Sequence, residues 1–266
     1  MDQRSRDLRK LIVKGLEGAK KGHAGSAFSA VEIIRVLYDE IMDYKPSQPN
    51  WPDRDRFILS KGHGCLALYA ILSDKGFIKE SELSGYTSDT SRLGGCCEII
   101  VPGVEATSGA LGHGLPIGVG QALAAKLQKR KSRIFVLIGD GEMGEGSVWE
   151  AALAAAKHKL SNLTVLIDCN KLQIAGATKD ILNLDPIKDK WEAFGFETIE
   201  IGGHDVEELK KILNKVPLSK DKPTALICHT VKGKGIPFAE NDYTWHWKGG
   251  IDDELVAKMN AALEGK

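Results

Sequence analysis

Residues 136–147 read VLIGDGEMGEGS and join a short apolar run to a turn rich in glycine and acid. The apolar run has the length and composition of a strand buried on both faces of a parallel sheet. Gly139 and Gly141 allow the backbone to turn tightly and to approach a ligand closely. In open parallel sheets, ligands bind beyond the carboxyl ends of the strands. The stretch therefore predicts a ligand site at one edge of such a sheet.

The acid inside this turn indicates a metal. The helix expected next offers free N–H groups to an anion, but Asp140 would repel a bare phosphate. A divalent cation removes the conflict, because Mg²⁺ typically binds one or two protein oxygens together with phosphate oxygens. The G-x-x-x-x-G-K-[ST] spacing of a Walker loop is absent. A dinucleotide-binding loop fits poorly as well, since the acid would face the pyrophosphate. We expect a metal held between Asp140 and a diphosphate.

The following strand supplies further candidate ligands. It ends in LIDCNKLQIAG, and residues 142–169, 28 in all, separate Gly141 from Asn170. That distance suits one helix plus one strand, so the two strand ends are expected to be neighbours. The side-chain oxygen of Asn170 and the backbone carbonyl of Leu172 are then candidates for the same cation.

Short apolar runs alternate with helical patterns along the whole chain. This alternation predicts an α/β fold whose mostly parallel sheet is covered by helices on both faces. No linker or repeat divides the chain, so we expect a single domain over residues 1–266. The predicted strands are 56–60, 133–139, 162–169, 196–202 and 223–230, and the predicted helices are 3–20, 28–43, 146–160, 186–195, 205–215 and 251–266, with a glycine-rich helix start within 111–129.

Composition excludes several classes of partner. The formal net charge is zero and the pI is about 7, so no overall basic field attracts nucleic acid or an anionic membrane. No apolar run is long enough to span a bilayer. The five cysteines are odd in number and contain no C-x-x-C, which argues against a disulfide framework or a zinc site. A reducing cytoplasmic setting is the simplest inference.

Taken together, the motifs resemble one family. GDGEMGEGSVWEA followed by LIDCNK is similar to the thiamine diphosphate signature, in the form found in transketolases. KGHAGSAFSAVEI, RFILSKGHG, VPGVEATSGALGHGLPIGVGQALAAK and VKGKGIPFAENDYTWH then occur in transketolase order across nearly the whole chain. The resemblance implies a thiamine diphosphate-binding fold of the diphosphate-binding type. It implies thiamine diphosphate and Mg²⁺, or Ca²⁺, as cofactors.

The resemblance also assigns roles to single residues. Asp140, Asn170 and the carbonyl of Leu172 match the metal ligands. Three histidines match catalytic positions, and the first of them also contacts substrate: His23, His63 and His246. The residues expected to bind the cofactor are His63, Gly109, Leu111, Gly139, Asp140, Gly141, Glu142, Asn170, Ile174 and His246.

Other readings remain open for several of these side chains. His63 could cap a helix, and His23 could be an exposed loop residue. His246 could simply be packed between Trp245 and Trp247. Two lysines of VKGKG, at 232 and 234, fit either a solvated face or a role in balancing phosphate charge.

One position departs from the family pattern. Transketolases usually carry Gly-His-Pro shortly before the PGVE segment, and that histidine contacts the donor sugar. SRLGGCCEIIVPGVE aligns Cys96 with the histidine and Cys97 with the proline. A thiol is a weak hydrogen-bond donor and does not replace an imidazole. Cys96 is therefore a candidate substrate contact that puts the usual donor sugar in doubt.

The resemblance implies the N-terminal subunit of a split transketolase, a transferase of carbohydrate metabolism. Such an enzyme moves a two-carbon ketol unit from a ketose phosphate to an aldose phosphate. The pyrimidine-binding and C-terminal domains are expected on a partner chain, in a heterotetramer with two copies of each. The alternatives are a transketolase for an unusual sugar phosphate, with a sulfo- or branched-chain sugar, and a non-catalytic thiamine diphosphate-binding subunit. PGVEATSGALGHG and TWH disfavour 1-deoxyxylulose-phosphate synthases and the α subunits of 2-oxo acid dehydrogenases.

Overall fold

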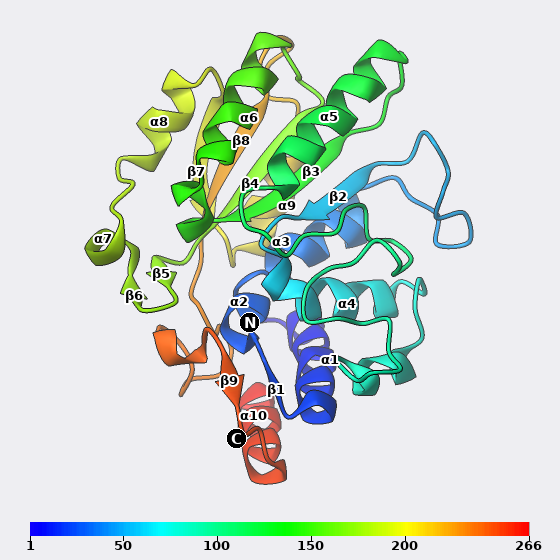
Figure 1. The fold of residues 1–266 in the computed structure, drawn as a ribbon, viewed down its shortest axis with the longest axis vertical. Coiled ribbons are helices and arrows are strands. Elements are labelled where there is room, and N and C mark those ends of the chain that lie inside the picture. Colours follow the sequence, from blue (N-terminus) through cyan, green and yellow to red (C-terminus); the bar gives the residue numbers. More distant parts are fainter. Residues whose placement is uncertain (266) are drawn as a thin grey trace.

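A five-stranded parallel sheet forms the centre of the computed structural model, which describes residues 1–265 (Figure 1). Every neighbouring pair of strands is parallel, as the alternating sequence pattern predicted. The strand order is β2-β3-β4-β8-β7, with bounds Arg56–Leu59, Ile134–Gly139, Leu163–Cys169, Thr224–His229 and Glu197–Gly202.

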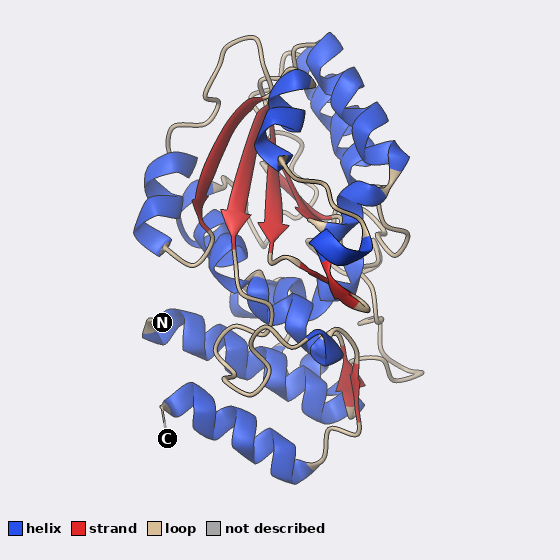
Figure 2. Ribbon diagram, turned by 90° about the vertical axis from the view of Figure 1, so that its left-hand side faces the viewer, coloured by secondary structure: helices blue, strands red, loops and turns tan. Residues whose placement is uncertain are grey.

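Helices cover both faces of this sheet (Figures 1 and 2). One face carries α5 (Gly114–Leu127), α6 (Gly146–Lys157) and α8 (Ile187–Ala193). The other carries α3 (Val31–Val36) and α9 (Val206–Leu213), with α4 (Cys65–Asp74) and α1 (Gln3–Ala19) packed beyond them. The predicted fold class is confirmed.

The central strands are apolar throughout because each feeds two separate cores. On β3, Phe135 and Leu137 join the core on the α1 and α4 side, whereas Val136 and Ile138 join the core under α5 and α6. All four side chains are fully buried. This two-sided burial explains why the run before Gly139 shows no alternation of polar and apolar residues.

The two ends of the chain meet beneath the carboxyl edge of the sheet. Helices α1 and α10 (Asp253–Glu264) pack side by side, and Asp252 caps α10 through the N–H of Leu255 (Figure 2). Strand β1 (Lys21–Gly22) pairs antiparallel with β9 (Lys248–Gly249). This pairing brings the segment around residue 23 next to the segment around residue 246.

The structure differs from the sequence prediction mainly in the helix expected over 28–43. It is divided into α2 (Ala24–Ser29), α3 and a π-helical turn, Leu37–Ile41, because the N–H of Ala30 bonds three residues back to Ala27. A 3₁₀ turn, Gly141–Gly144, also separates the Gly-Asp-Gly turn from α6. The remaining elements are 3₁₀ turns at Gly62–Gly64, Glu80–Gly85 and Tyr243–Trp245, short strands β5 (Leu172–Gln173) and β6 (Gly176–Ala177), and α7 (Thr178–Ile181).

None of the helices within residues 1–265 combines the length and the apolar character needed to cross a bilayer.

Gly62 is expected to be indispensable where the chain leaves β2. A Cβ at this position would lie 1.2 Å from the carbonyl oxygen of Ser108, so one backbone segment would have to move. We expect Gly62→Ala to lower the free energy of unfolding by about 3 kcal/mol or more. Gly146→Ala is the matched control, because nothing lies within 4 Å of the added atom. It should be neutral or stabilise α6 by about 0.5–1 kcal/mol. Urea denaturation measures both, and equal effects would contradict the close approach.

Candidate active site

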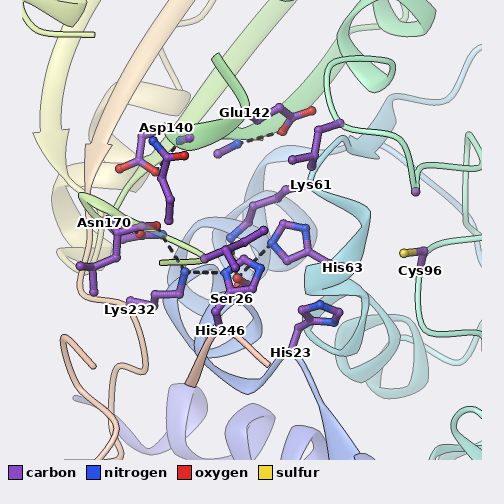
Figure 3. Close-up of a pocket in the computed structure, with 17 residues that line it drawn as sticks. His23, Ser26, Lys61, His63, Cys96, Asp140, Glu142, Asn170, Lys232 and His246 are labelled. Carbon is purple, nitrogen blue, oxygen red and sulfur yellow. Dashed lines mark hydrogen bonds between the residues drawn. The ribbon is translucent and has the colours of Figure 1, made fainter. Parts of the chain in front are cut away.

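A cavity of about 320 Å³ opens at the carboxyl edge of the sheet (Figure 3). All the residues that the sequence analysis assigned to cofactor, metal, catalysis or substrate line it. Their convergence is observed, whereas their individual roles stay predictions. The lining residues are His23, Ser26, Lys61, His63, Cys96, Gly109, Leu111, Gly139, Asp140, Gly141, Glu142, Asn170, Leu172, Gln173, Ile174, Lys232 and His246.

Strand register explains this convergence. Gly139 at the end of β3 pairs with Asp168 on β4, and Asp168 pairs with Cys228 on β8. The residues that follow each strand therefore emerge side by side. Asp140 follows β3 and Asn170 follows β4. Lys61 and His63 follow β2, and Lys232 follows β8, in agreement with the rule for ligand sites in parallel sheets.

The predicted metal ligands form an oxygen-rich corner. The carboxylate of Asp140 accepts hydrogen bonds from the N–H groups of Gly141, at 2.8 Å, and Lys171. Asn170 Oδ1 accepts from the N–H of Leu172 at 3.1 Å. Each of these oxygens keeps further lone-pair capacity, and carboxylate, amide and carbonyl oxygens are ligands that Mg²⁺ and Ca²⁺ prefer.

Within residues 1–265, no cluster of three His, Cys, Asp or Glu side chains could hold a metal alone. The oxygen corner contributes one carboxylate, one amide and one carbonyl, so a cation bound there needs additional oxygens. Phosphate oxygens would supply them. The donor set therefore fits a metal that arrives together with a phosphorylated ligand.

Asp140 is electrostatically unsatisfied. Its side chain is only 5% exposed, and burial, together with the charge of Asp168, raises its pKa to about 6. Asp168 is fully buried and forms an ion pair with Lys61. A carboxylate in this condition gains from a nearby cation.

Two buried lysines face the same cavity, and the sequence analysis did not single out the first of them. Lys61 and Lys232 are each 2% exposed. The ammonium of Lys61 also donates to the carbonyl of Ser26 at 2.9 Å. The signal for Lys61 was its place in SKGHG directly after a strand, but nothing in the sequence showed its partner, Asp168.

The lysine that the sequence left ambiguous is now placed. Lys232 Nζ contacts the carbonyl oxygen of Leu172 at 3.3 Å and His246 Nδ1 at 2.9 Å. Lys234 instead pairs with Glu240, outside the set of residues that line the cavity. Of the two lysines in VKGKG, only Lys232 is in a position to contact a ligand.

Three histidines form a compact cluster. The ring centroid of His23 lies 5.1 Å from that of His63 and 5.4 Å from that of His246, and the last two are 5.1 Å apart. Burial, assisted by the charge of Lys232, lowers the pKa of His23 to about 4 and that of His246 to about 3. Burial and Lys61 depress the pKa of His63 as well. All three imidazoles are therefore neutral near pH 7.

The other readings of these histidines do not describe the structure. Gly64 rather than His63 is the N-cap of α4, and His63 Nε2 lies 3.1 Å from Ser26 Oγ. His23 is half-buried, and its Nδ1 has no hydrogen-bond partner among the described residues. His246 faces the cavity instead of being enclosed by its aromatic neighbours. An orphaned nitrogen at a cavity wall is suited to a ligand.

Glu142 lines the cavity with both oxygens already engaged. Its carboxylate accepts from the N–H groups of Gly112, at 2.8 Å, and Gly139, at 3.0 Å, and from the hydroxyl of Ser60. Glu142 thus ties three segments of the site together. Its predicted role in cofactor binding is best understood as support for the Gly-Asp-Gly turn.

Cys96 lies on the far side of the cavity from the oxygen corner (Figure 3). Successive side chains alternate here: Cys97 is buried, with its Sγ 3.8 Å from the carbonyl of Gly62, so Cys96 faces the cavity. Its carbonyl accepts from Tyr69 Oη at 2.9 Å, which fixes the loop. Burial and the charge of Glu98 raise the pKa of the Cys96 thiol, so it is a neutral thiol near pH 7.

Comparison with known proteins agrees with this geometry. Residues 2–264 match the family model described as transketolase, thiamine diphosphate binding domain. One of the two subunits of an apulose-4-phosphate transketolase from Actinobacillus succinogenes is 46% identical, with 93% of this chain and 90% of that protein covered. A 6-deoxy-6-sulfo-D-fructose transketolase subunit from Clostridium sp. is 36% identical, with 92% of each covered.

A solved structure shares the fold as well. Transketolase from Leishmania mexicana superposes with a TM-score of 0.91 at 31% sequence identity. The match covers 98% of this chain but 41% of that longer protein. The chain therefore spans less than half of a full-length transketolase and nearly all of the two shorter relatives.

The raised pKa of Asp140 has a consequence for stability. Its folded-state pKa of about 6 lies above the ordinary value of 3.8, so its contribution to stability is complete below pH 3.8 and is lost as the pH rises through 6. Asp140→Asn removes this loss. We expect the free energy of unfolding of the variant, relative to the parent, to increase by up to about 3 kcal/mol between pH 4 and 7 in metal-free buffer.

Urea denaturation across that pH range measures the difference. The exposed Asp180→Asn is the control and should show no such trend. A difference between Asp140→Asn and the parent that stays constant with pH would contradict the buried, unsatisfied state of Asp140.

Proposed function

The chain belongs to the transketolase family, as its thiamine diphosphate-binding domain, and from this premise we propose that it is the diphosphate-binding subunit of a two-chain transketolase. With its partner it transfers a two-carbon ketol unit from a ketose phosphate to an aldose phosphate. The observation that carries the proposal is the single cavity in which the oxygen corner, two buried ammonium groups and three neutral histidines meet.

The residues present suit thiamine diphosphate and a divalent metal. Asp140, Asn170 and the carbonyl of Leu172 would hold Mg²⁺ or Ca²⁺, and the two buried lysines offset the phosphate charge. Leu111 and the exposed Ile174 offer apolar surface at the cavity for the cofactor rings. When bound, the cofactor supplies the electron sink for breaking and forming the bond next to a sugar carbonyl.

The chain's own contribution is binding and proton handling. Neutral imidazoles accept protons, so His23 and His63 enter the reaction as bases rather than as acids. A single positioned acid–base group contributes roughly 10²- to 10⁴-fold in rate. Their clustering within 5.1 Å of one another allows a proton to pass between them and a substrate hydroxyl.

The rest of the active site is proposed to come from a second chain. The relative from Actinobacillus succinogenes is itself named as one subunit of a transketolase, and 90% of its length matches this chain. We propose a single domain here, a partner that carries the pyrimidine-binding and C-terminal domains, and a heterotetramer with two copies of each. All five cysteines are free thiols, which suits the cytoplasmic location that we propose.

An unusual sugar phosphate is the favoured substrate class. Cys96 lines the cavity where the family pattern has a histidine that contacts the donor sugar. The two shorter relatives are named for apulose 4-phosphate and for a sulfonated deoxyfructose. A neutral thiol offers little hydrogen bonding, so it accommodates a sugar whose hydroxyl pattern differs from that of the common donors.

Calorimetric titration and a coupled assay test the proposal. The full chain should bind thiamine diphosphate in the presence of Mg²⁺ or Ca²⁺, and Asp140→Asn should weaken this binding by at least about tenfold, since it removes the charged metal ligand. Ketol transfer should appear only after addition of a partner chain with a pyrimidine-binding domain. A neighbouring reading frame of about 300 residues is the first candidate for that partner.

The outcomes separate the alternatives. Turnover by the chain alone would contradict the two-chain enzyme. Cofactor binding without turnover of any sugar phosphate, even with the partner present, would favour the non-catalytic alternative. Failure to bind thiamine diphosphate would overturn the proposed function itself.

Cys96 is expected to set donor preference. In the two-chain enzyme, Cys96→His should raise kcat/KM for an ordinary donor such as xylulose 5-phosphate about tenfold relative to a branched or sulfonated ketose phosphate, because it restores one hydrogen bond. Cys96→Ala is the matched control, and it should leave the ratio within about twofold, since a thiol contributes little hydrogen bonding. A loss of activity in Cys96→Ala as large as the change in Cys96→His would assign the thiol a different role.

A further inference from the structure

Lys232 links the two halves of the site. It follows β8, and its stem packs against α2, where a Cβ added at Gly25 would lie 3.1 Å from Lys232 Cγ. Its ammonium reaches the carbonyl oxygen of Leu172 on one side and His246 Nδ1 on the other (Figure 3). One buried charge thus joins the oxygen corner to the histidine cluster.

The contact with His246 has a direction. An ammonium group has three N–H donors and no acceptor, so the nitrogen that it meets at 2.9 Å must accept. A neutral imidazole has one accepting and one donating nitrogen. If Nδ1 accepts from Lys232, the proton of the ring lies on Nε2.

We propose that Lys232 is a positioning residue that fixes His246 in the Nε2–H tautomer, so that His246 presents a hydrogen-bond donor to the ligand in the cavity. The inference rests on the proposed function only for the identity of that ligand. Burial and neighbouring Lys61 lower the pKa of Lys232 to about 8, so the ammonium form predominates at pH 7. The low pKa of His246, about 3, keeps the ring neutral.

The tautomer limits what His246 does. Its Nε2 forms no hydrogen bond with a described residue and is not among the buried atoms that lack a partner, so it is open to the cavity. A donating Nε2–H recognises an acceptor, such as a phosphate oxygen or the oxygen of a sugar. It does not remove a proton. Proton abstraction therefore falls to the other two histidines, and His23 has an unpartnered nitrogen for it.

Nitrogen NMR of the full chain, labelled with ¹⁵N-histidine and free of cofactor, tests the assignment. Loss of signals in His246→Gln identifies the two nitrogens of His246. In the parent chain, Nδ1 should give a pyridine-type signal and Nε2 a pyrrole-type signal. Lys232→Met keeps an apolar stem and removes the donor. In this variant the two signals should move toward each other as both tautomers become populated.

Lys234→Met is the matched control. It removes a lysine from the same loop that pairs with Glu240 rather than with a histidine, and it should leave the His246 signals unchanged. The same variants can be titrated with inorganic diphosphate and Mg²⁺. Lys232→Met should weaken that binding about tenfold or more, whereas Lys234→Met should change it by less than about twofold.

Two results would overturn the inference: a pyridine-type Nε2 in the parent chain, or His246 signals that Lys232→Met leaves unchanged. If Lys232→Met does not fold, the parent spectrum still decides the tautomer, and Lys232→Gln tests whether a neutral donor preserves it. The spectra need no cofactor. Failure to bind thiamine diphosphate would therefore reject the proposed function while the tautomer assignment stands or falls separately.

Discussion

The site depends on two acids that the sheet register forces together. Gly139 pairs with Asp168 across β3 and β4, so Asp140 emerges directly beside a fully buried carboxylate. Two neighbouring buried carboxylates are stable only with cations close by. Lys61 satisfies Asp168 through an ion pair supported by the hydroxyls of Ser29 and Thr230. Asp140 has backbone N–H donors but no such ion pair, and this imbalance makes the edge of the sheet a cation site.

The positive charges that answer these acids also define the histidines. Lys61 and Lys232 lie within the electrostatic reach of the cluster and, with burial, hold its pKa values below the usual range. Bases that stay neutral near pH 7 are ready to accept protons without first losing one. The same arrangement that stabilises a buried ion pair thus prepares the catalytic side chains. Binding a polyanionic ligand beside the lysines would raise these pKa values and let the imidazoles return a proton later in the cycle.

The sequence predicted the parts of the fold that depend on local patterns. The apolar runs at 133–139 and 162–169 correspond to β3 and β4 because both faces of these strands are buried. The glycine and acid turns at their ends carried enough information to place Asp140 and Asn170 together. The position of β8 between β4 and β7 was not predictable, because strand order depends on long-range packing rather than on the pattern of each strand.

The missed features have the same physical origin. The ion pair between Lys61 and Asp168 joins residues 107 apart in sequence, and neither side chain has a local signal for it. VKGKG offered two equivalent lysines, and only the turn after β8, with Gly233 at φ +79°, decides that Lys232 faces inward. The helix expected over 28–43 was divided because a backbone bond at Ala30 is a property of the packed chain. Contacts that close over long loops are invisible to pattern reading.

The charges within the cavity also bear on how its ligands depend on one another. Asp140, Glu142 and Asp168 contribute three carboxylates against the two ammonium groups of Lys61 and Lys232. A bare diphosphate would therefore meet an excess of negative charge, and a lone cation would find few protein oxygens. A divalent ion reverses the sign of the site and brings the oxygens of the phosphate into its own coordination sphere. Each ligand then binds more tightly when the other is present, and this dependence is reciprocal by thermodynamic linkage. The oxygen corner and the buried lysines are halves of one binding unit, which explains why Lys232 contacts both.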